Sequence, residues 1–231
     1  MNGLVVKQLT FAYRGGAPIL AGVDLTVSPG EVVCLLGANG SGKSTLLACM
    51  MGFLSPQAGS IAVDGVDCQE NPKKARQKLA YLPESVALWG FLTAVEHVRL
   101  VAEMTGTSPD PATLLRRAGL AEEAWRWPVA SFSKGMRQKL ALILATIRQP
   151  SVALLDEPTS GLDPDSAQAM VMSLRSLADE GVGVLVVTHD LWLVAQVAQR
   201  FGFLRGGRIV HQGQASDWQV LAGLFSGGSA R

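Results

Sequence analysis

A glycine-rich segment, Gly37–Thr45, constrains the fold of this chain more than any other feature. Its sequence is GANGSGKST, which matches the spacing GxxxxGK[ST]. The segment follows a short apolar run, Glu31–Leu36, which is typical of a strand buried on both faces of a parallel sheet. It precedes a predicted helix from Lys43 to about Gly52. A strand, a glycine loop and a helix in this order predict a phosphate-binding loop at the end of a parallel strand.

The residue types in this loop suit a bound phosphate chain. Glycines let successive backbone N–H groups turn toward the phosphates, and the start of the helix adds a partial positive charge. Lys43 can reach the β- and γ-phosphates, and the Ser44 hydroxyl can ligate Mg²⁺. The alternative is a glycine-rich turn before an ordinary helix, which requires the full pattern to arise by chance. The candidate phosphate-binding residues are Gly37, Asn39, Gly40, Ser41, Gly42, Lys43, Ser44 and Thr45.

Two adjacent carboxylates follow a second apolar run. Residues 152–155 predict a central strand, and Asp156 and Glu157 come directly after it, where open α/β sheets bind ligands. Asp156 would hold Mg²⁺ through water, while Glu157 could orient and deprotonate an attacking water. The alternative is a strand that ends in a solvated acidic turn, and the phosphate loop elsewhere in the chain weighs against it.

The remaining patterns predict an open parallel sheet with a helical lobe inserted into it. The middle third, about 83–149, is mainly helical, and the last third alternates strands with helices. The tail Ser226–Arg231 is expected to be loose. Strands are expected at Leu4–Leu9, Ile19–Val27, 152–155, 183–187, 201–205 and 208–212, and helices at Thr93–Gly106, 110–118, Lys134–Arg148, 164–180 and 190–199.

Composition excludes several classes of protein. The chain has 231 residues and a net charge of +1, which argues against a broadly basic nucleic-acid binder. Its apolar runs are far shorter than the roughly 20 residues of a membrane span, and its first residues lack a signal-peptide pattern. Cys34, Cys49 and Cys68 form no CxxC and are expected to be reduced core residues of a cytoplasmic protein. Charged residues make up only 17%, which favours contact with something apolar.

Further motifs resemble those of the ATP-binding subunits of ABC transporters across nearly the whole chain. Residues 131–138, SFSKGMRQ, resemble the family signature around Leu-Ser-Gly-Gly-Gln, and residues 160–163, SGLD, resemble its D-loop. Thr188-His189-Asp190 resembles the switch histidine segment. Tyr13 stands about thirty residues before Lys43 and resembles the aromatic residue that stacks on adenine, although a lone aromatic is often a core residue.

The resemblance implies a P-loop NTPase of the ABC cassette type. Its fold would be α/β, with a mostly parallel sheet core, N-terminal antiparallel strands and an inserted helical subdomain. The catalytic core would comprise about 1–82 and 150–231, and the subdomain about 83–149. The chain would be an ATPase that uses ATP and Mg²⁺ and acts at the cytoplasmic face of the membrane with transmembrane permease subunits, and nucleic acid would not be a partner.

The resemblance also implies roles for particular residues. Glu157 and His189 would be catalytic, and Ser44, Glu84 and Asp156 would hold the metal. Cassettes would pair head to tail as a homodimer or heterodimer, so that each signature closes over the ATP of its partner. The residues concerned would be Ser133, Lys134, Gly135 and Met136 of the signature and Asp163 of the D-loop.

The motifs depart from the usual family pattern at several positions. Phe132, Lys134 and Met136 replace Leu, Gly and Gln of the signature, and Glu84 stands where the family usually has glutamine. Glu84 would either ligate Mg²⁺ or face solvent or a partner. These variants resemble cassettes of exporters more than those of amino-acid or sugar importers. The alternative function is a soluble ABC-type ATPase of a cytoplasmic machine, such as iron–sulfur cluster assembly.

An apolar loop, Ser85–Leu92, precedes the predicted cap Thr93. In the family the corresponding groove receives a short helix of the membrane subunit. Trp89 and Phe91 flank a glycine, and we expect that the two rings do not both turn inward. They are therefore candidate docking residues, and the alternative is that both rings pack against the helical lobe.

Overall fold

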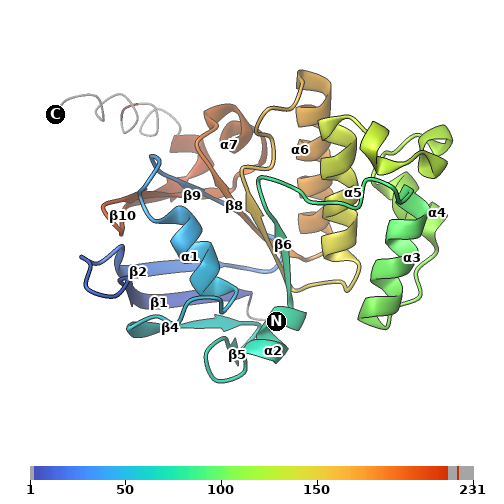
Figure 1. The fold of residues 1–231 in the computed structure, drawn as a ribbon. Coiled ribbons are helices and arrows are strands. Elements are labelled where there is room, and N and C mark those ends of the chain that lie inside the picture. Colours follow the sequence, from blue (N-terminus) through green and yellow to red (C-terminus); the bar gives the residue numbers. More distant parts are fainter. Residues whose placement is uncertain (1–2, 218–222, 224–231) are drawn as a thin grey trace.

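The computed structural model describes residues 3–217 and residue 223 of the chain (Figure 1). Their strands form two sheets with the orders β2-β1-β4-β5 and β10-β9-β3-β8-β7-β6. The first sheet comprises β1 (Leu4–Phe11), β2 (Leu20–Val27), β4 (Ala58–Val63) and β5 (Val66–Asp67). The second comprises β3 (Val32–Leu36), β6 (Leu79–Leu82), β7 (Val152–Asp156), β8 (Gly183–Thr188), β9 (Arg200–Arg205) and β10 (Arg208–Gln214). The predicted loose tail, Ser226–Arg231, lies outside the described residues.

The helices of the described residues include seven α-helices and three short 3₁₀ helices. The α-helices are α1 (Lys43–Met50), α2 (Pro72–Gln77), α3 (Ala94–Thr105), α4 (Pro111–Arg117), α5 (Lys134–Thr146), α6 (Pro164–Asp179) and α7 (Leu191–Val197). The 3₁₀ helices are Glu122–Arg126, Val129–Ser131 and Ala215–Asp217.

The six-stranded sheet separates two hydrophobic cores. Strands β9, β3, β8, β7 and β6 pair in parallel, and only β10 pairs antiparallel. Alternate residues of β3 point to opposite faces, so Val33 and Leu35 pack with α1 and the antiparallel sheet, while Val32 and Leu36 pack with α6 and α7. The predicted α/β fold, with a mainly parallel sheet and N-terminal antiparallel strands, is confirmed.

Helices α3, α4 and α5 follow β6 and precede β7 in the sequence, and they form one group beside the sheet (Figure 1). They enclose a separate core that includes Val98, Leu115 and Leu140. Helix α3 begins with a capping box, because Thr93 Oγ1 accepts from the Glu96 N–H while the Glu96 carboxylate accepts from the Thr93 N–H. A helical insertion is therefore present, and its predicted limits at about 83 and 149 stay a prediction.

Some element bounds differ from those predicted. Strand β1 continues to Phe11, past a bulge where Gln8 has a φ of 47° and the apolar alternation is lost. Helix α5 ends at Thr146 instead of Arg148, shortly before Gln149 adopts a φ of 53°. Helix α7 ends at Val197, because the Gln199 N–H already donates to Val32 O at the start of the sheet.

The three cysteines lie in the hydrophobic cores with free thiols. Burial raises the pKa of the Cys49 thiol to about 11, and burial together with the nearby Asp67 carboxylate raises that of Cys68 to about 11. Burial also raises the pKa of Cys34. These thiols are core residues with little thiolate character, in agreement with the prediction of reduced structural cysteines.

Candidate functional site

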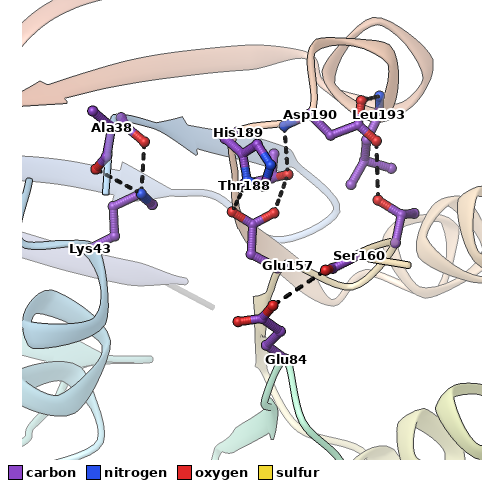
Figure 2. Close-up of polar contacts among 11 residues, drawn as sticks. Ala38, Lys43, Glu84, Glu157, Ser160, Thr188, His189, Asp190 and Leu193 are labelled. Atoms are coloured by element: carbon purple, nitrogen blue, oxygen red, sulfur yellow. Dashed lines mark hydrogen bonds and ion pairs between the residues drawn. The ribbon is translucent and has the colours of Figure 1, made fainter. Parts of the chain in front are cut away.

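Parallel pairing brings three strand ends to one edge of the sheet. Leu36 at the end of β3 is paired with Thr188 at the end of β8, and Asp156 at the end of β7 is paired with Val187. The glycine loop, the Asp156-Glu157 pair and His189 therefore emerge side by side, although more than a hundred residues separate the first from the others. Figure 2 shows Lys43, Glu157 and His189 at this edge.

The glycine loop wraps around the ammonium group of Lys43. The Lys43 side chain is buried, and its Nζ donates to Gly37 O at 2.7 Å and to Ala38 O at 3.1 Å (Figure 2). A Cβ on Gly37 would lie 2.5 Å from Leu204 O, and Gly42 has a φ of 106°. Glycine is therefore required at both positions, and the loop is held as a compact cradle around one cation.

The other loop residues are disposed around this cation. Asn39, Gly40 and Ser44 are exposed, and Thr45 is half-buried. Ser41 is buried, and its Oγ has no hydrogen-bond partner among the described residues. A buried hydroxyl without a partner, beside exposed backbone and a lysine, suits a polyanionic ligand that accepts hydrogen bonds.

Both carboxylate oxygens of Glu157 are held by strand β8 and the residue after it. Oε2 accepts from Thr188 Oγ1 at 2.8 Å, and Oε1 lies 2.6 Å from His189 Nδ1 (Figure 2). The Glu157 side chain is 11% exposed and that of His189 is 64% exposed. A carboxylate fixed beside a phosphate cradle and in reach of water is the arrangement that general-base chemistry requires.

Thr188 is a site residue to which the sequence interpretation gave no role, although it named the segment Thr188-His189-Asp190. It is fully buried, and its Oγ1 also accepts from the Asp190 N–H at 3.0 Å. The Asp190 carboxylate caps α7 by accepting from the Trp192 N–H at 2.9 Å. A hydroxyl residue at the end of an otherwise apolar strand, next to a histidine, is the signal that could have identified it.

Asp156 lies in an environment that disfavours its negative charge. Burial raises its pKa, the Glu157 and Glu84 carboxylates raise it further, and Lys43 opposes them. Among the described residues no group of three or more His, Cys, Asp or Glu could hold a metal alone. Mg²⁺ is usually held by one or two carboxylates together with substrate phosphates, so Asp156, Glu84 and the exposed Ser44 hydroxyl fit this ion.

Glu84 lies at the margin of the site, two residues after β6. Its side chain is exposed, and its Oε1 accepts from Ser160 Oγ at 3.3 Å (Figure 2). Its charge reaches Asp156, since it contributes to the raised pKa of that residue. Glu84 is thus exposed and also electrostatically part of the site, and its role as a Mg²⁺ ligand stays a prediction.

The signature residues form the start of α5. Ser133 caps this helix by accepting from the Met136 N–H at 3.2 Å. Gly135 is buried against α6, where an added Cβ would lie 2.3 Å from Ser166 Oγ. Lys134 is exposed and Met136 is half-buried. This helix start, with its cap and partial positive charge, is a suitable anion contact.

The structure does not bring the signature to the glycine loop. Helix α1 packs in one core and α5 contributes to the others, so the two helices lie apart in Figure 1. Asp163 caps α6 by accepting from both the N–H and the hydroxyl of Ser166, and these bonds lower its pKa. Within one chain, Asp163 therefore has a structural role at the start of α6.

Tyr13 presents its ring beyond the end of β1. Its side chain is 54% exposed, and its ring meets that of buried Phe11 edge to face at 5.0 Å. Because one part of the ring is anchored and the rest is exposed, Tyr13 is free to stack against a ligand. Its role toward adenine stays a prediction.

The apolar loop before α3 exposes both candidate docking residues. Trp89 is 48% exposed and Phe91 is 77% exposed, so the alternative that both rings pack against the lobe does not fit Phe91. The Trp89 N–H donates to Nε2 of buried His97 at 3.2 Å. The next residue, Gly90, packs on Ala130 and accepts its N–H at 2.9 Å. The backbone of this loop is therefore fixed. The Phe91 side chain faces outward, whereas the half-exposed Trp89 ring lies against the ring of buried His97, with the centroids 5.8 Å apart.

Known proteins share this sequence and fold. Residues 20–160 match the ABC transporter family. The ABC-type transporter ATP-binding protein EcsA of Bacillus subtilis is 33% identical over 229 residues, which cover 97% of this chain and 92% of EcsA. The lantibiotic transport ATP-binding protein SrtF of Streptococcus pyogenes is 32% identical and covers 96% of both chains. The glutamine transport ATP-binding protein GlnQ of Escherichia coli is 34% identical and covers 87% of both chains.

A solved structure extends the comparison to the nucleotide state. It is a dimeric ATP-binding cassette in a post-hydrolysis state, bound to ADP and Pi. It is 26% identical to this chain with a TM-score of 0.80, and the match covers 92% of this chain and 98% of the other. No helix of the described residues is long and apolar enough to cross a bilayer. The family match and the relatives more than 30% identical show that the chain belongs to the ABC transporter family and is one of its ATP-binding, ATP-hydrolysing cassettes.

Proposed function

We propose that this cassette hydrolyses ATP with Glu157 as the base and that it powers a membrane transporter. The observation that carries the proposal is the position of the Glu157 carboxylate. It is held by Thr188 and His189 at the sheet edge that also carries the Lys43 cradle. A water placed between this carboxylate and a γ-phosphate at Lys43 can lose its proton to Glu157 as it attacks the phosphorus.

The other residues of the site complete this proposal. The cradle formed by residues 37–45 would bind the triphosphate, with the Lys43 ammonium on the β- and γ-phosphates and Tyr13 stacked on adenine. Ser44, Asp156 and Glu84 would hold Mg²⁺, which when bound neutralises charge that develops on the phosphates. His189 is 64% exposed beside Glu157 and would contact the γ-phosphate.

We further propose that two cassettes close head to tail, as a homodimer or a heterodimer. The glycine loop and the signature lie on helices that pack in different cores of one chain. A second cassette is therefore needed to bring Ser133, Lys134, Gly135 and Met136 onto bound ATP. The post-hydrolysis relative with ADP and Pi is dimeric, which supports this arrangement. Asp163, two residues from the Ser160–Gly161 turn, would lie near the interface.

The proposed partner is a transmembrane permease subunit at the cytoplasmic face of the membrane. The helical subdomain, about 83–149, would present Trp89 and Phe91 to it, because both rings are exposed on a loop with a fixed backbone. Export is the proposed direction, since SKGMRQ and YLPE resemble exporter cassettes. The names of the relatives include lantibiotic transport and glutamine transport, so the transported substrate is not proposed.

The test of the catalytic role is Glu157→Gln. Glutamine keeps an oxygen that can accept from Thr188, so nucleotide binding should remain while turnover falls by about 10²–10⁴-fold. With ATP present, the variant should accumulate as a dimer on a sizing column. The matched control is Glu103→Gln, at an exposed glutamate on α3, and it should behave as wild type. Turnover near the wild-type rate in Glu157→Gln would assign the base to another residue.

A further inference from the structure

Ser160 uses all of its polar groups to join three parts of the molecule. Its N–H donates to Glu157 O at 3.0 Å, which closes the turn after β7. Its Oγ donates to Glu84 Oε1 at 3.3 Å (Figure 2). Its carbonyl accepts from Lys134 Nζ at 2.5 Å. The start of α5, the segment after β6 and the turn that carries Glu157 therefore meet at one residue.

Lys134 occupies a position that does not suit a lysine locally. It is the first residue of α5, where the partial positive charge of the helix disfavours a cation. Its ammonium reaches Ser160 O, 26 residues along the chain. The Lys134 side chain also lies over Gly161, the residue after Ser160, since a Cβ added to Gly161 would be 2.8 Å from Lys134 Nζ. A locally unfavourable residue with a long-range contact points to a role for that contact.

The contact continues to Glu157 through the backbone. Glu157 has a φ of 46°, a left-handed conformation that is unusual for a residue other than glycine. Its N–H donates to Val187 O at 2.8 Å, and its carbonyl accepts from the Ser160 N–H. These two bonds hold this conformation from either side, and Lys134 in turn fixes Ser160. Movement of Ser160 would release one side of the residue that carries the carboxylate.

We propose that Lys134 is a positioning residue that fixes the turn at Glu157 through Ser160. The proposal rests on the proposed function, in which Glu157 is the base. It assigns to Lys134 a contact inside its own chain, in addition to any contact with the ATP of a partner cassette. Loss of the contact should loosen residues 159–162 and lower turnover, while leaving the affinity for ATP nearly unchanged.

The experiment compares Lys134→Met, Lys134→Arg and Lys139→Met in the purified full-length chain. Methionine keeps much of the side-chain length but removes the donor, whereas arginine keeps a donor and the charge. Lys139 is the matched control, because it lies on the same helix and its Nζ donates to another carbonyl, Gly119 O, at 3.2 Å. Amide hydrogen exchange is measured without nucleotide on peptides that cover residues 158–163, and kcat and KM for ATP are measured with Mg²⁺.

Lys134→Met should speed exchange in residues 159–162 and lower kcat, each by about tenfold, for the loss of one charge-assisted hydrogen bond. KM should stay within about twofold, Lys134→Arg should recover at least half of both effects, and Lys139→Met should show neither. Unchanged exchange in Lys134→Met would overturn the proposal, and so would a rise in KM without a fall in kcat, which would make Lys134 only a phosphate ligand. Faster exchange with unchanged kcat would also overturn it.

Failure of the proposed function is distinguishable from failure of this inference. If Glu157→Gln hydrolysed ATP at the wild-type rate, the base would lie elsewhere. The exchange measurement on Lys134→Met would still decide whether Lys134 holds the 159–162 turn, because it is made without nucleotide and does not depend on ATP hydrolysis. The two experiments therefore test the base and the positioning contact separately.

Discussion

Replacing Glu84 with glutamine tests how charge at the site margin controls nucleotide binding. Burial raises the pKa of Asp156, the Glu157 and Glu84 carboxylates raise it further, and Lys43 opposes them, so the negative charge of Glu84 acts on the other charges of the site. Glutamine removes one negative charge and keeps an oxygen that can accept from Ser160 Oγ. The change is therefore mainly electrostatic and leaves the local contacts in place.

The size of the effect follows from Coulomb's law. For a bound phosphate taken to lie about 7–8 Å from the exposed Glu84 carboxylate, an effective dielectric constant of about 40–60 gives a repulsion of roughly 0.7–1.2 kcal/mol per unit charge. Without Mg²⁺ the variant should thus bind ATP about three- to eightfold more tightly than wild type. With Mg²⁺ this advantage should vanish or reverse, because a carboxylate is the better ligand for a hard cation.

The assay is calorimetric titration with ATP, once in excess Mg²⁺ and once in EDTA. The quantity compared for each protein is the dissociation constant for ATP in EDTA divided by the dissociation constant in excess Mg²⁺. This ratio should be at least about threefold larger in wild type than in Glu84→Gln. The matched control is Glu103→Gln on α3, which removes an exposed carboxylate from another part of the chain and should keep the wild-type ratio. An equal ratio in wild type and Glu84→Gln would refute this reasoning and show that the exposed Glu84 carboxylate acts neither on bound Mg²⁺ nor on the phosphates.

Three further predictions concern docking, packing and pH. Trp89→Ala should lower the melting temperature only slightly and abolish co-purification with a membrane subunit. The control Trp192→Ala, at a similarly exposed tryptophan, should keep the complex. A sharp loss of stability in Trp89→Ala with the complex intact would make Trp89 a core residue. Gly135→Ala should cost about 1–3 kcal/mol of unfolding free energy, because its Cβ would lie 2.3 Å from Ser166 Oγ, and the added change Ser166→Ala should recover part of this in a chemical unfolding experiment. Because the pKa of Asp156 is higher in the folded than in the unfolded protein, the folded state holds the Asp156 proton more tightly. The contribution of Asp156 to the free energy of unfolding therefore falls as pH rises above about 4. Asp156→Asn should therefore raise the melting temperature at neutral pH in EDTA and lose stabilisation by Mg²⁺ and ATP, and a lower melting temperature in EDTA would contradict this.

The phosphate cradle could be predicted from the sequence because its determinants are contiguous. Residues 37–45 form the loop by themselves, and the burial of the preceding strand fixes where the loop emerges. The same holds for the caps Thr93, Ser133 and Asp163, each of which bonds an N–H three residues ahead. Local patterns of this kind need no knowledge of the tertiary fold.

Contacts between distant residues could not be predicted in the same way. Thr188 and Glu157 are 31 residues apart, and their bond depends on the register of β7 against β8. The Lys134 contact with Ser160 depends on the placement of α5 against the core, and the Glu84 contact depends on the pairing of β6 with β7. The exposure of Phe91 likewise depends on tertiary packing, because an apolar residue in an apolar loop has no periodicity that assigns it to a face.

The low fraction of charged residues and the position of the site have a common cause. Strands β3 and β8 are buried at every position, so a charge within them would be buried without a partner. Ionisable groups are tolerated only where the strands end, and parallel pairing aligns three such ends at one edge. Lys43, Asp156 and Glu157 are thereby brought together in a partly dry environment, where each interaction between charges is stronger than in water. The architecture that buries the strands therefore also concentrates the charges that phosphoryl transfer requires.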